Sequence, residues 1–272
     1  KPYLCKLIQG KRPEELLFMV FMDYTNCTNN IHTSELSLPG GSLPLGVEIQ
    51  QLVYNFNCFP LRDMYFVEYR IINKSSLIWD STYIGICSDS DLGDASDDAS
   101  GCDTVKNLGY IYNFDNNDNE YGVNPLVVGI RFLQSPLRFT GINTDTAKLP
   151  YDTLTGYKLI GMTTHNSFKS GICLGDPDNY IEAYNLLKGF DNCGNPMINW
   201  ITGQPSKFRF NGNACQRTGW YDSTQGDKKN FIGSGPFKMN SGDTQVIMTS
   251  FMITRDGGTN LQNVCALQSL SD

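Results

Sequence analysis

Residues 88–103 form the segment whose residue types have the clearest capacity for chemistry, because six of its 16 residues are aspartates and no basic residue balances them. Six carboxylates in one loop repel each other unless a counterion lies among them, and Ca²⁺ takes about six to eight oxygen ligands from such loops. Gly93 and Gly101 let the backbone turn tightly enough to add carbonyl oxygens. The sequence therefore predicts a calcium site formed by the aspartates of this loop: Asp89, Asp91, Asp94, Asp97, Asp98 and Asp103.

The spacing of these aspartates differs from that of an EF-hand, which needs a Glu at position 12 of its loop. Counting from Asp89 places Ser100 at that position, and counting from Asp94 places Val105 there. Mg²⁺ is a weaker candidate than Ca²⁺, because it prefers to keep its water ligands. The alternative to a metal site is an exposed, solvated acidic loop.

A second polar stretch, residues 115–122, spaces Asp115, Asn117 and Asn119 at alternate positions. These side chains offer further oxygen ligands to a cation. The same pattern is typical of a polar hairpin loop between two strands, and the sequence leaves both interpretations open.

The net charge of −7 is concentrated in one part of the chain. Residues 75–130 contain ten acidic residues and one basic residue, which leaves 18 acidic and 20 basic residues elsewhere. Such a field repels phosphate, so nucleic acid and an anionic membrane surface are disfavoured as partners. The longest apolar run, Leu16–Met22, has 7 residues. A membrane helix needs about 20, so we expect no membrane insertion.

The nine cysteines indicate disulfides rather than a zinc site, because no Cys-x-x-Cys pair occurs and the chain has two histidines. Two local pairs are feasible by spacing: Cys87 with Cys102 across the acidic loop, and Cys173 with Cys193. The alternative is that most of the cysteines are small buried apolar residues.

Patterns for catalysis are scarce. His32 and His165 have no linked nucleophile, and no Gly-x-Ser-x-Gly motif is present. We therefore expect a non-enzymatic protein, with a hydrolase that uses the carboxylates of the acidic loop as the weaker alternative. The 14 Tyr and 3 Trp, among them Trp200 and Trp220-Tyr221, suit either the packing of sugar rings or a sandwich core.

Short alternating strands separated by turn residues position these groups. We predict strands at 47–56, 64–72, 81–87, 110–112, 127–133, 158–162, 207–210 and 244–253. A helix capped by Asp176 or Asp178 ends before Gly189, and a second short one covers 196–202. Residues 260–270 are predicted to be the start of another helix, which this chain does not complete.

This pattern predicts a mainly β protein, an antiparallel β-sandwich of jelly-roll or immunoglobulin-like type with a long acidic metal-binding loop and a small helical insertion. Residues 1–140 form the β-rich part with the acidic loop, 141–205 a mixed insertion, and 206–272 the strands that complete one structural domain.

One run of this sequence, residues 79–98, reads Trp79-Asp80-Ser81-Thr82-Tyr83-Ile84-Gly85-Ile86-Cys87-Ser88-Asp89-Ser90-Asp91-Leu92-Gly93-Asp94-Ala95-Ser96-Asp97-Asp98. It resembles a signature of large secreted proteins of Bacteroidota and Ignavibacteria-type bacteria. Those proteins commonly end in a type IX secretion sorting domain. Three further stretches are similar to the same family: 21–26, 121–125 and 226–237. Where the family often has an aromatic residue and a proline, this chain has Cys87 and Ser90, which favours the Cys87–Cys102 pair.

The resemblance implies a secreted or surface-attached module and does not imply an enzyme. Together with the predicted ion site, it leads us to expect a non-catalytic, calcium-stabilised extracellular module with a structural or adhesive role. Its expected partners are further copies of itself, in an oligomer or surface filament, or surface glycans. The alternative function is a carbohydrate-binding module of a secreted multidomain enzyme.

Overall fold

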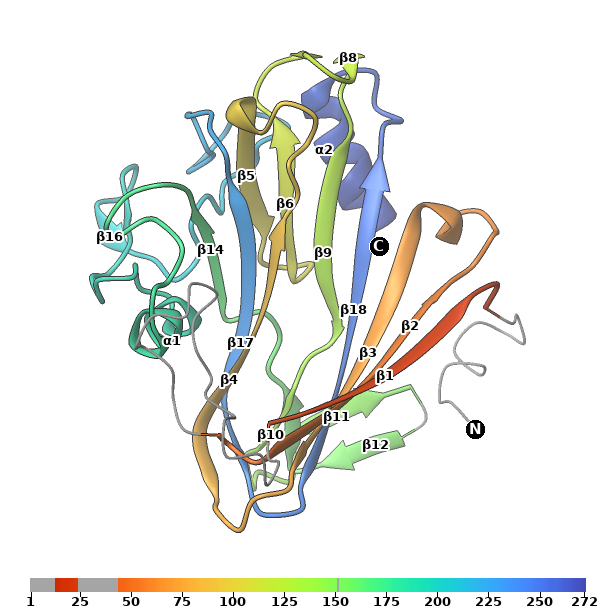
Figure 1. Ribbon diagram of the computed structural model, residues 1–272, viewed down its shortest axis with the longest axis vertical. Coiled ribbons are helices and arrows are strands. Elements are labelled where there is room, and N and C mark those ends of the chain that lie inside the picture. The colour runs from red at the N-terminus through yellow and green to blue at the C-terminus, as the bar shows by residue number, and fades with distance from the viewer. Residues whose placement is uncertain (1–12, 24–43, 151) are drawn as a thin grey trace.

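Alternating apolar residues build the largest of the antiparallel sheets in the computed structural model, which describes residues 13–23, 44–150 and 152–272 (Figure 1). This sheet, called sheet A here, has seven strands. In spatial order they are β1 (Leu16–Met22), β2 (Val47–Asn55), β3 (Met64–Asn73), β18 (Thr244–Thr254), β9 (Val127–Gln134), β6 (Leu108–Asn113) and β5 (Asp98–Asp103).

Three strands form the smaller sheet B, in the order β14 (Thr164–Phe168), β17 (Lys229–Met239) and β4 (Trp79–Asp89). Side chains from both sheets meet in one core cluster. Ile232 of β17, with Ile86 of β4 against it, packs with Ile130, Phe132 and Ile247 of sheet A. The mainly β, antiparallel sandwich predicted from the alternation is therefore confirmed.

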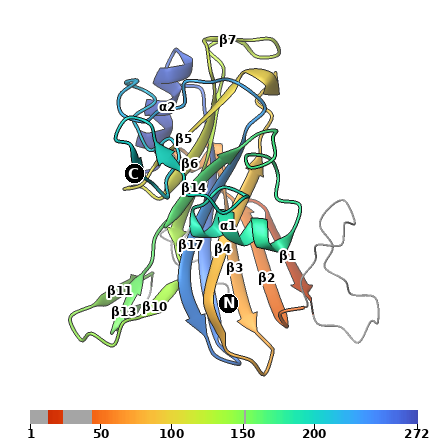
Figure 2. The same ribbon diagram turned by 90° about the vertical axis from the view of Figure 1, so that its left-hand side faces the viewer.

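The two helices cover the outer faces of the sandwich. Helix α1 (Tyr180–Lys188) lies across sheet B (Figure 2) and buries Leu186 against Phe168 and Phe231. Helix α2 (Asn260–Leu270) packs on sheet A, where its Leu267 joins a cluster with Leu108. At 9 and 11 residues, these helices are too short to cross a bilayer, and the described residues contain no helix that could.

Helix α1 begins one or three residues later than the two caps suggested by the sequence would place it. Asn179, rather than Asp176 or Asp178, is the N-cap, because its side chain accepts hydrogen bonds from the backbone of Ile181 and Glu182. The helix ends before Gly189, as predicted, and this glycine, its C-cap, adopts the left-handed conformation with φ of 86°.

Short hairpins extend from the two sheets. They are β7 (Asn117–Asp118) with β8 (Gly122–Val123), β10 (Leu137–Phe139) with β13 (Tyr157–Leu159), β11 (Thr146–Leu149) with β12 (Asp152–Thr155), and β15 (Ile198–Asn199) with β16 (Gln204–Pro205).

Two predicted elements do not form. The segment 196–202 is not a helix, because Asn199 accepts hydrogen bonds from the backbone of Ile201 and Thr202 and closes the turn between β15 and β16. The segment 207–210 is not a strand. Only Phe208 makes a bridge, to His165, and Phe210 has a left-handed φ of 55°.

Two disulfides join described cysteines. The predicted Cys173–Cys193 bridge is confirmed, and a second bridge, Cys215–Cys265, ties helix α2 to the segment that precedes β17. The predicted Cys87–Cys102 bridge does not form. Cys102 points into the core between the sheets, whereas Cys87 alternates with the inward-facing Ile86 and so lies on the outer face of sheet B.

Candidate metal centre

Three aspartates meet where β4 ends and β17 begins. Asp89 is the last residue of β4, Asp91 lies two residues later, and Asp227 lies two residues before β17. One carboxylate oxygen from each of the three lies within 4.8 Å of the others, and all three side chains are exposed. We call this group the acidic triad. Three carboxylates at this spacing are a donor set that can hold a metal ion.

Antiparallel pairing brings the triad together. Asp89 pairs with Lys229, so the chain that leaves β4 runs beside the chain that enters β17. The two sequence-predicted ligands Asp89 and Asp91 therefore meet Asp227, which lies outside the acidic loop and was not among the predicted ligands. The only signal for Asp227 in the sequence was its place in the stretch 226–237, which shares the family resemblance with the acidic loop.

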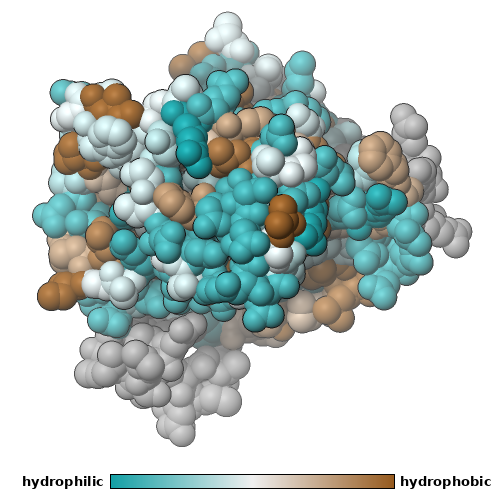
Figure 3. All heavy atoms as spheres, turned by 90° about the horizontal axis from the view of Figure 1, so that it is seen from above, coloured by the Kyte–Doolittle hydropathy of each residue, from teal (hydrophilic) through white to brown (hydrophobic). Residues whose placement is uncertain are grey.

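The charge around the triad is only partly balanced. Lys229 lies 3.1 Å from a carboxylate oxygen of Asp89 and 2.7 Å from one of Asp176. Partial burial raises the pKa of Asp227, and the nearby charges of Asp89 and Asp91 raise it further. Three other carboxylates and one ammonium group thus lie close enough to influence the charge of Asp227, and a bound divalent cation would relieve the excess of negative charge. The end of the molecule that carries the acidic loop is largely hydrophilic (Figure 3).

Asp98 differs from the other aspartates of the loop because it is fully buried at the start of β5. Its Oδ2 accepts a hydrogen bond from the backbone of Leu92 at 3.2 Å, and its Oδ1 has no partner among the described residues. Burial raises the pKa of Asp98 to about 8, with smaller contributions from the charges of Asp97 and Asp91. Asp98 is therefore mostly protonated at neutral pH in the metal-free protein.

The second polar stretch folds over the acidic loop through Asp118, which is 1% exposed. Its carboxylate accepts hydrogen bonds from the backbone of Asp94 at 2.9 Å and of Glu120 at 2.7 Å. Gly93 has a left-handed φ of 66°, and a Cβ there would lie 2.2 Å from the Asp118 carboxylate. Asn119 donates to Asp94, so these two predicted ligands bind each other rather than the triad.

The remaining predicted ligands serve local turns. Asp103 accepts hydrogen bonds from the backbone N–H groups of Val105 and Lys106. It lies at the opposite end of β5 from Asp98, so the two residues are roughly 16 Å apart at the usual strand rise. Asp115 accepts a hydrogen bond from the backbone N–H of Asn117 at 2.8 Å. This contact is typical of a polar hairpin loop, which was one of the two interpretations of that stretch.

Asp97 lies in a short 3₁₀ helix, and the structure does not group it with the triad. Burial and the charge of Asp118 raise its pKa.

No protein-family model matches the chain, and no curated protein is significantly similar to it. The resemblance to secreted bacterial proteins therefore stays a prediction.

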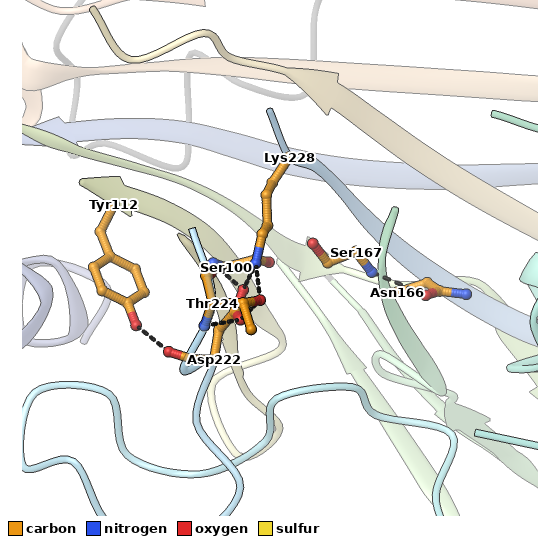
Figure 4. A network of polar contacts seen from close by, with 7 residues as sticks. All are labelled: Ser100, Tyr112, Asn166, Ser167, Asp222, Thr224 and Lys228. Carbon is orange, nitrogen blue, oxygen red and sulfur yellow. Dashed lines mark hydrogen bonds and ion pairs between the residues drawn. The ribbon is translucent and has the colours of Figure 1, made fainter. Parts of the chain in front are cut away.

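A buried ion pair holds Asp227 in place. Lys228 and Asp222 form a salt bridge with side chains that are 3% and 0% exposed, and Asp222 also accepts from the backbone of Ser100 at 3.1 Å (Figure 4). On the other side of Asp227, Gly226 donates to the backbone carbonyl of Asp98 at 3.0 Å. Both neighbours of Asp227 are thus anchored to β5, and its backbone is fixed beside the acidic loop.

The other residues considered for chemistry are placed differently. His165 is fully buried, and burial lowers its pKa to about 4. His32 lies outside the described residues, and so do Tyr24, Thr25 and Asn26 of the stretch 21–26. Trp220 is 6% exposed and packs on Phe210 in a small core cluster. Trp200 is 63% exposed.

The buried pair provides a stability test. We expect Lys228→Met to lower the free energy of unfolding by about 3–5 kcal/mol, because it leaves the Asp222 carboxylate buried without its cation. The matched control is Lys229→Met, whose partners are half exposed, with an expected loss below about 1 kcal/mol. Urea unfolding in calcium-free buffer measures both, and equal losses would contradict the assignment.

Asp98 gives a pH test. Its pKa is raised in the folded state, so the folded protein holds this proton more tightly than the unfolded chain does. The contribution of the protonated Asp98 to the free energy of unfolding is fully present below pH 3.8 and is lost as the pH rises through about 8. In chelator, we expect Asp98→Asn to be more stable than the wild type by about 5–6 kcal/mol above pH 8, and to have a similar stability at pH 4. Identical pH profiles in urea unfolding would refute this.

Proposed function

We propose that this chain is a non-catalytic, extracellular β-sandwich module that binds Ca²⁺ at the acidic triad and has a structural or adhesive role at a cell surface. The observation that carries the proposal is the meeting of Asp89, Asp91 and Asp227 at the junction of β4 and β17. A cation there would bind the end of one strand to the start of its neighbour and so stabilise sheet B.

Calcium suits this donor set better than other common metals. All three ligands are carboxylates, which favours a hard cation over zinc or copper. The ligands lie on loops at an exposed edge, where the irregular and adaptable coordination of Ca²⁺ is satisfied more readily than the strict octahedron of Mg²⁺. Backbone carbonyls and water would complete the coordination shell.

An extracellular location is supported by the covalent structure. Cys173–Cys193 and Cys215–Cys265 are disulfides that persist in oxidising compartments and are rare in the cytosol. The resemblance of residues 79–98 to secreted bacterial proteins points to the same location.

Self-association is supported by the exposed edge of sheet A. Strand β1 consists of seven apolar residues, and six of them are between 44% and 56% exposed. The other edge of the sheet is covered by the chain itself, because Ser100 and Cys102 of β5 donate to Asp222 and Phe210. In the described part of the chain, β1 pairs with β2 alone.

A second copy of the chain fits this edge best, since it offers a strand that is equally apolar and uncharged. The exposed half of the six large side chains of β1 amounts to roughly 500 Å² of surface per copy, which is the size of a weak interface. We propose that two copies pair through β1.

The calcium proposal predicts a thermal shift. In chelator, we expect the melting temperature to fall by about 5–10 °C, and excess Ca²⁺ to restore it, because the ion binds the folded state alone. Asp227→Asn should abolish the calcium-dependent increment. Asp103→Asn, in the same acidic loop but away from the triad, is the control and should retain it. No shift in chelator, or equal responses of the two variants, would rule out calcium at the triad.

The pairing proposal predicts a concentration-dependent dimer in sedimentation velocity. Phe18→Lys on β1 should make the protein monomeric, since it places a charge within the paired strands. Phe139→Lys is the control, because Phe139 is 68% exposed on another hairpin, and it should leave the dimer unchanged. A wild type that is monomeric throughout, or a dimer that both variants weaken equally, would contradict pairing through β1.

A further inference from the structure

A cleft of about 460 Å³ opens between the two sheets, on the inner side of the strand end that carries the acidic triad. Ser88 and Ser90 line it, while Asp89 between them points to the outer face of sheet B. The volume is within the range of small-ligand sites, about 300–1,000 Å³. Nothing in the proposed calcium site uses this cleft.

One wall of the cleft is apolar and aromatic. Tyr65 of β3 and Phe251 of β18 are direct cross-strand neighbours, and their rings stack with centroids 4.7 Å apart and planes 6° apart. Tyr65 remains 44% exposed even though it stands beside the core. Ile130 and Ile253 extend the wall. A rigid aromatic pair of this kind offers apolar contact at little cost in conformational entropy.

The opposite wall is polar and fixed in place. Ser88 and Ser90 share a hydrogen bond of 2.7 Å between their hydroxyls. Asn230 of β17 is only 1% exposed, and one end of its amide lies 3.0 Å from Nε2 of the buried His165. The other end of the amide has no hydrogen-bond partner among the described residues, and Asn230 lines the cleft. A buried amide with a free end is a binding group for a polar ligand atom.

The charges around the cleft favour a neutral ligand. At its mouth, Arg62 and Asp63 lie 3.3 Å apart and compensate each other. The acidic triad on the other side of β4 repels anions. The ligand should therefore carry hydroxyl groups for the serine and amide wall and an apolar face for the aromatic wall, without net charge. A sugar ring has this combination of properties.

We propose that the cleft between the sheets binds a neutral carbohydrate, with Tyr65 and Phe251 packing on the ring and Asn230, Ser88 and Ser90 bonding its hydroxyls. This assigns an adhesive ligand to the module, and it requires neither the calcium site nor the pairing of β1.

The test is titration of the full chain with methyl glycosides of glucose, galactose, mannose, xylose and N-acetylglucosamine and with their disaccharides, followed by NMR and calorimetry. We expect at least one probe to bind and to shift the side-chain amide resonances of Asn230. Tyr65→Ala should weaken that binding by about tenfold or more, because the aromatic contact is lost. Asp227→Asn should leave it unchanged, which separates this proposal from the calcium site.

Tyr121→Ala is the matched control, because Tyr121 is 40% exposed, close to the exposure of Tyr65, and lies on the β7–β8 hairpin. It should bind the probe as the wild type does. Failure of every probe to bind at millimolar concentration would overturn the proposal. Binding that survives Tyr65→Ala, or that is lost instead in Trp200→Ala, would place the sugar elsewhere and would overturn it equally.

Discussion

The pairing of β4 with β17 sets Asp89 opposite Lys229 and Ser88 opposite Asn230, and the proposed calcium site and the proposed ligand cleft both depend on this register. Successive side chains of a strand point to opposite faces. The charged pair therefore lies on the outer face beside the acidic triad, and the polar pair lines the cleft between the sheets. A slip of one residue would exchange the two sets and destroy both surfaces. The register is fixed by the isoleucines that β4 and β17 bury in the core and by Phe231, which lies under α1 on the other face.

Charge burial is the second constraint on this end of the molecule. Asp222 and Lys228 are both buried, and such a pair is costly to form in an apolar interior unless further hydrogen bonds satisfy it. Those bonds come from Ser100 of β5 and from Thr224, whose carbonyl and hydroxyl both accept from Lys228. The pair thus ties the segment before β17 to the edge of sheet A. It covers an edge strand that would otherwise be open, and it holds Asp227 beside the acidic loop.

Much of the fold could be predicted because its signals are local. Alternation located β2, β3, β4, β9 and β18 with bounds that differ by a few residues at most. The final helix begins at the predicted residue, Asn260, but it is complete at Leu270, where the sequence suggested an unfinished helix. Two of the errors occurred where side chains compete with regular structure. Asn199 closes a turn in place of a helix, and Asn179 supplies the cap expected from an aspartate, because an amide oxygen satisfies the same backbone donors.

By itself, the sequence determined that the chain is rich in strands and that its acidity is concentrated in one region. It also indicated that Asp89 and Asp91 belong to a group of carboxylates that could hold a cation. Only the tertiary structure decided which of the aspartates stand together, since Asp227 reaches the triad through strand pairing and not through spacing along the chain. It also separated Cys87 from Cys102, which are near in sequence. Cys87 lies on the outer face of sheet B, whereas Cys102 of sheet A points into the core between the sheets. Composition and periodicity are properties of one segment, whereas a site made by two paired strands depends on a register that distant core residues set.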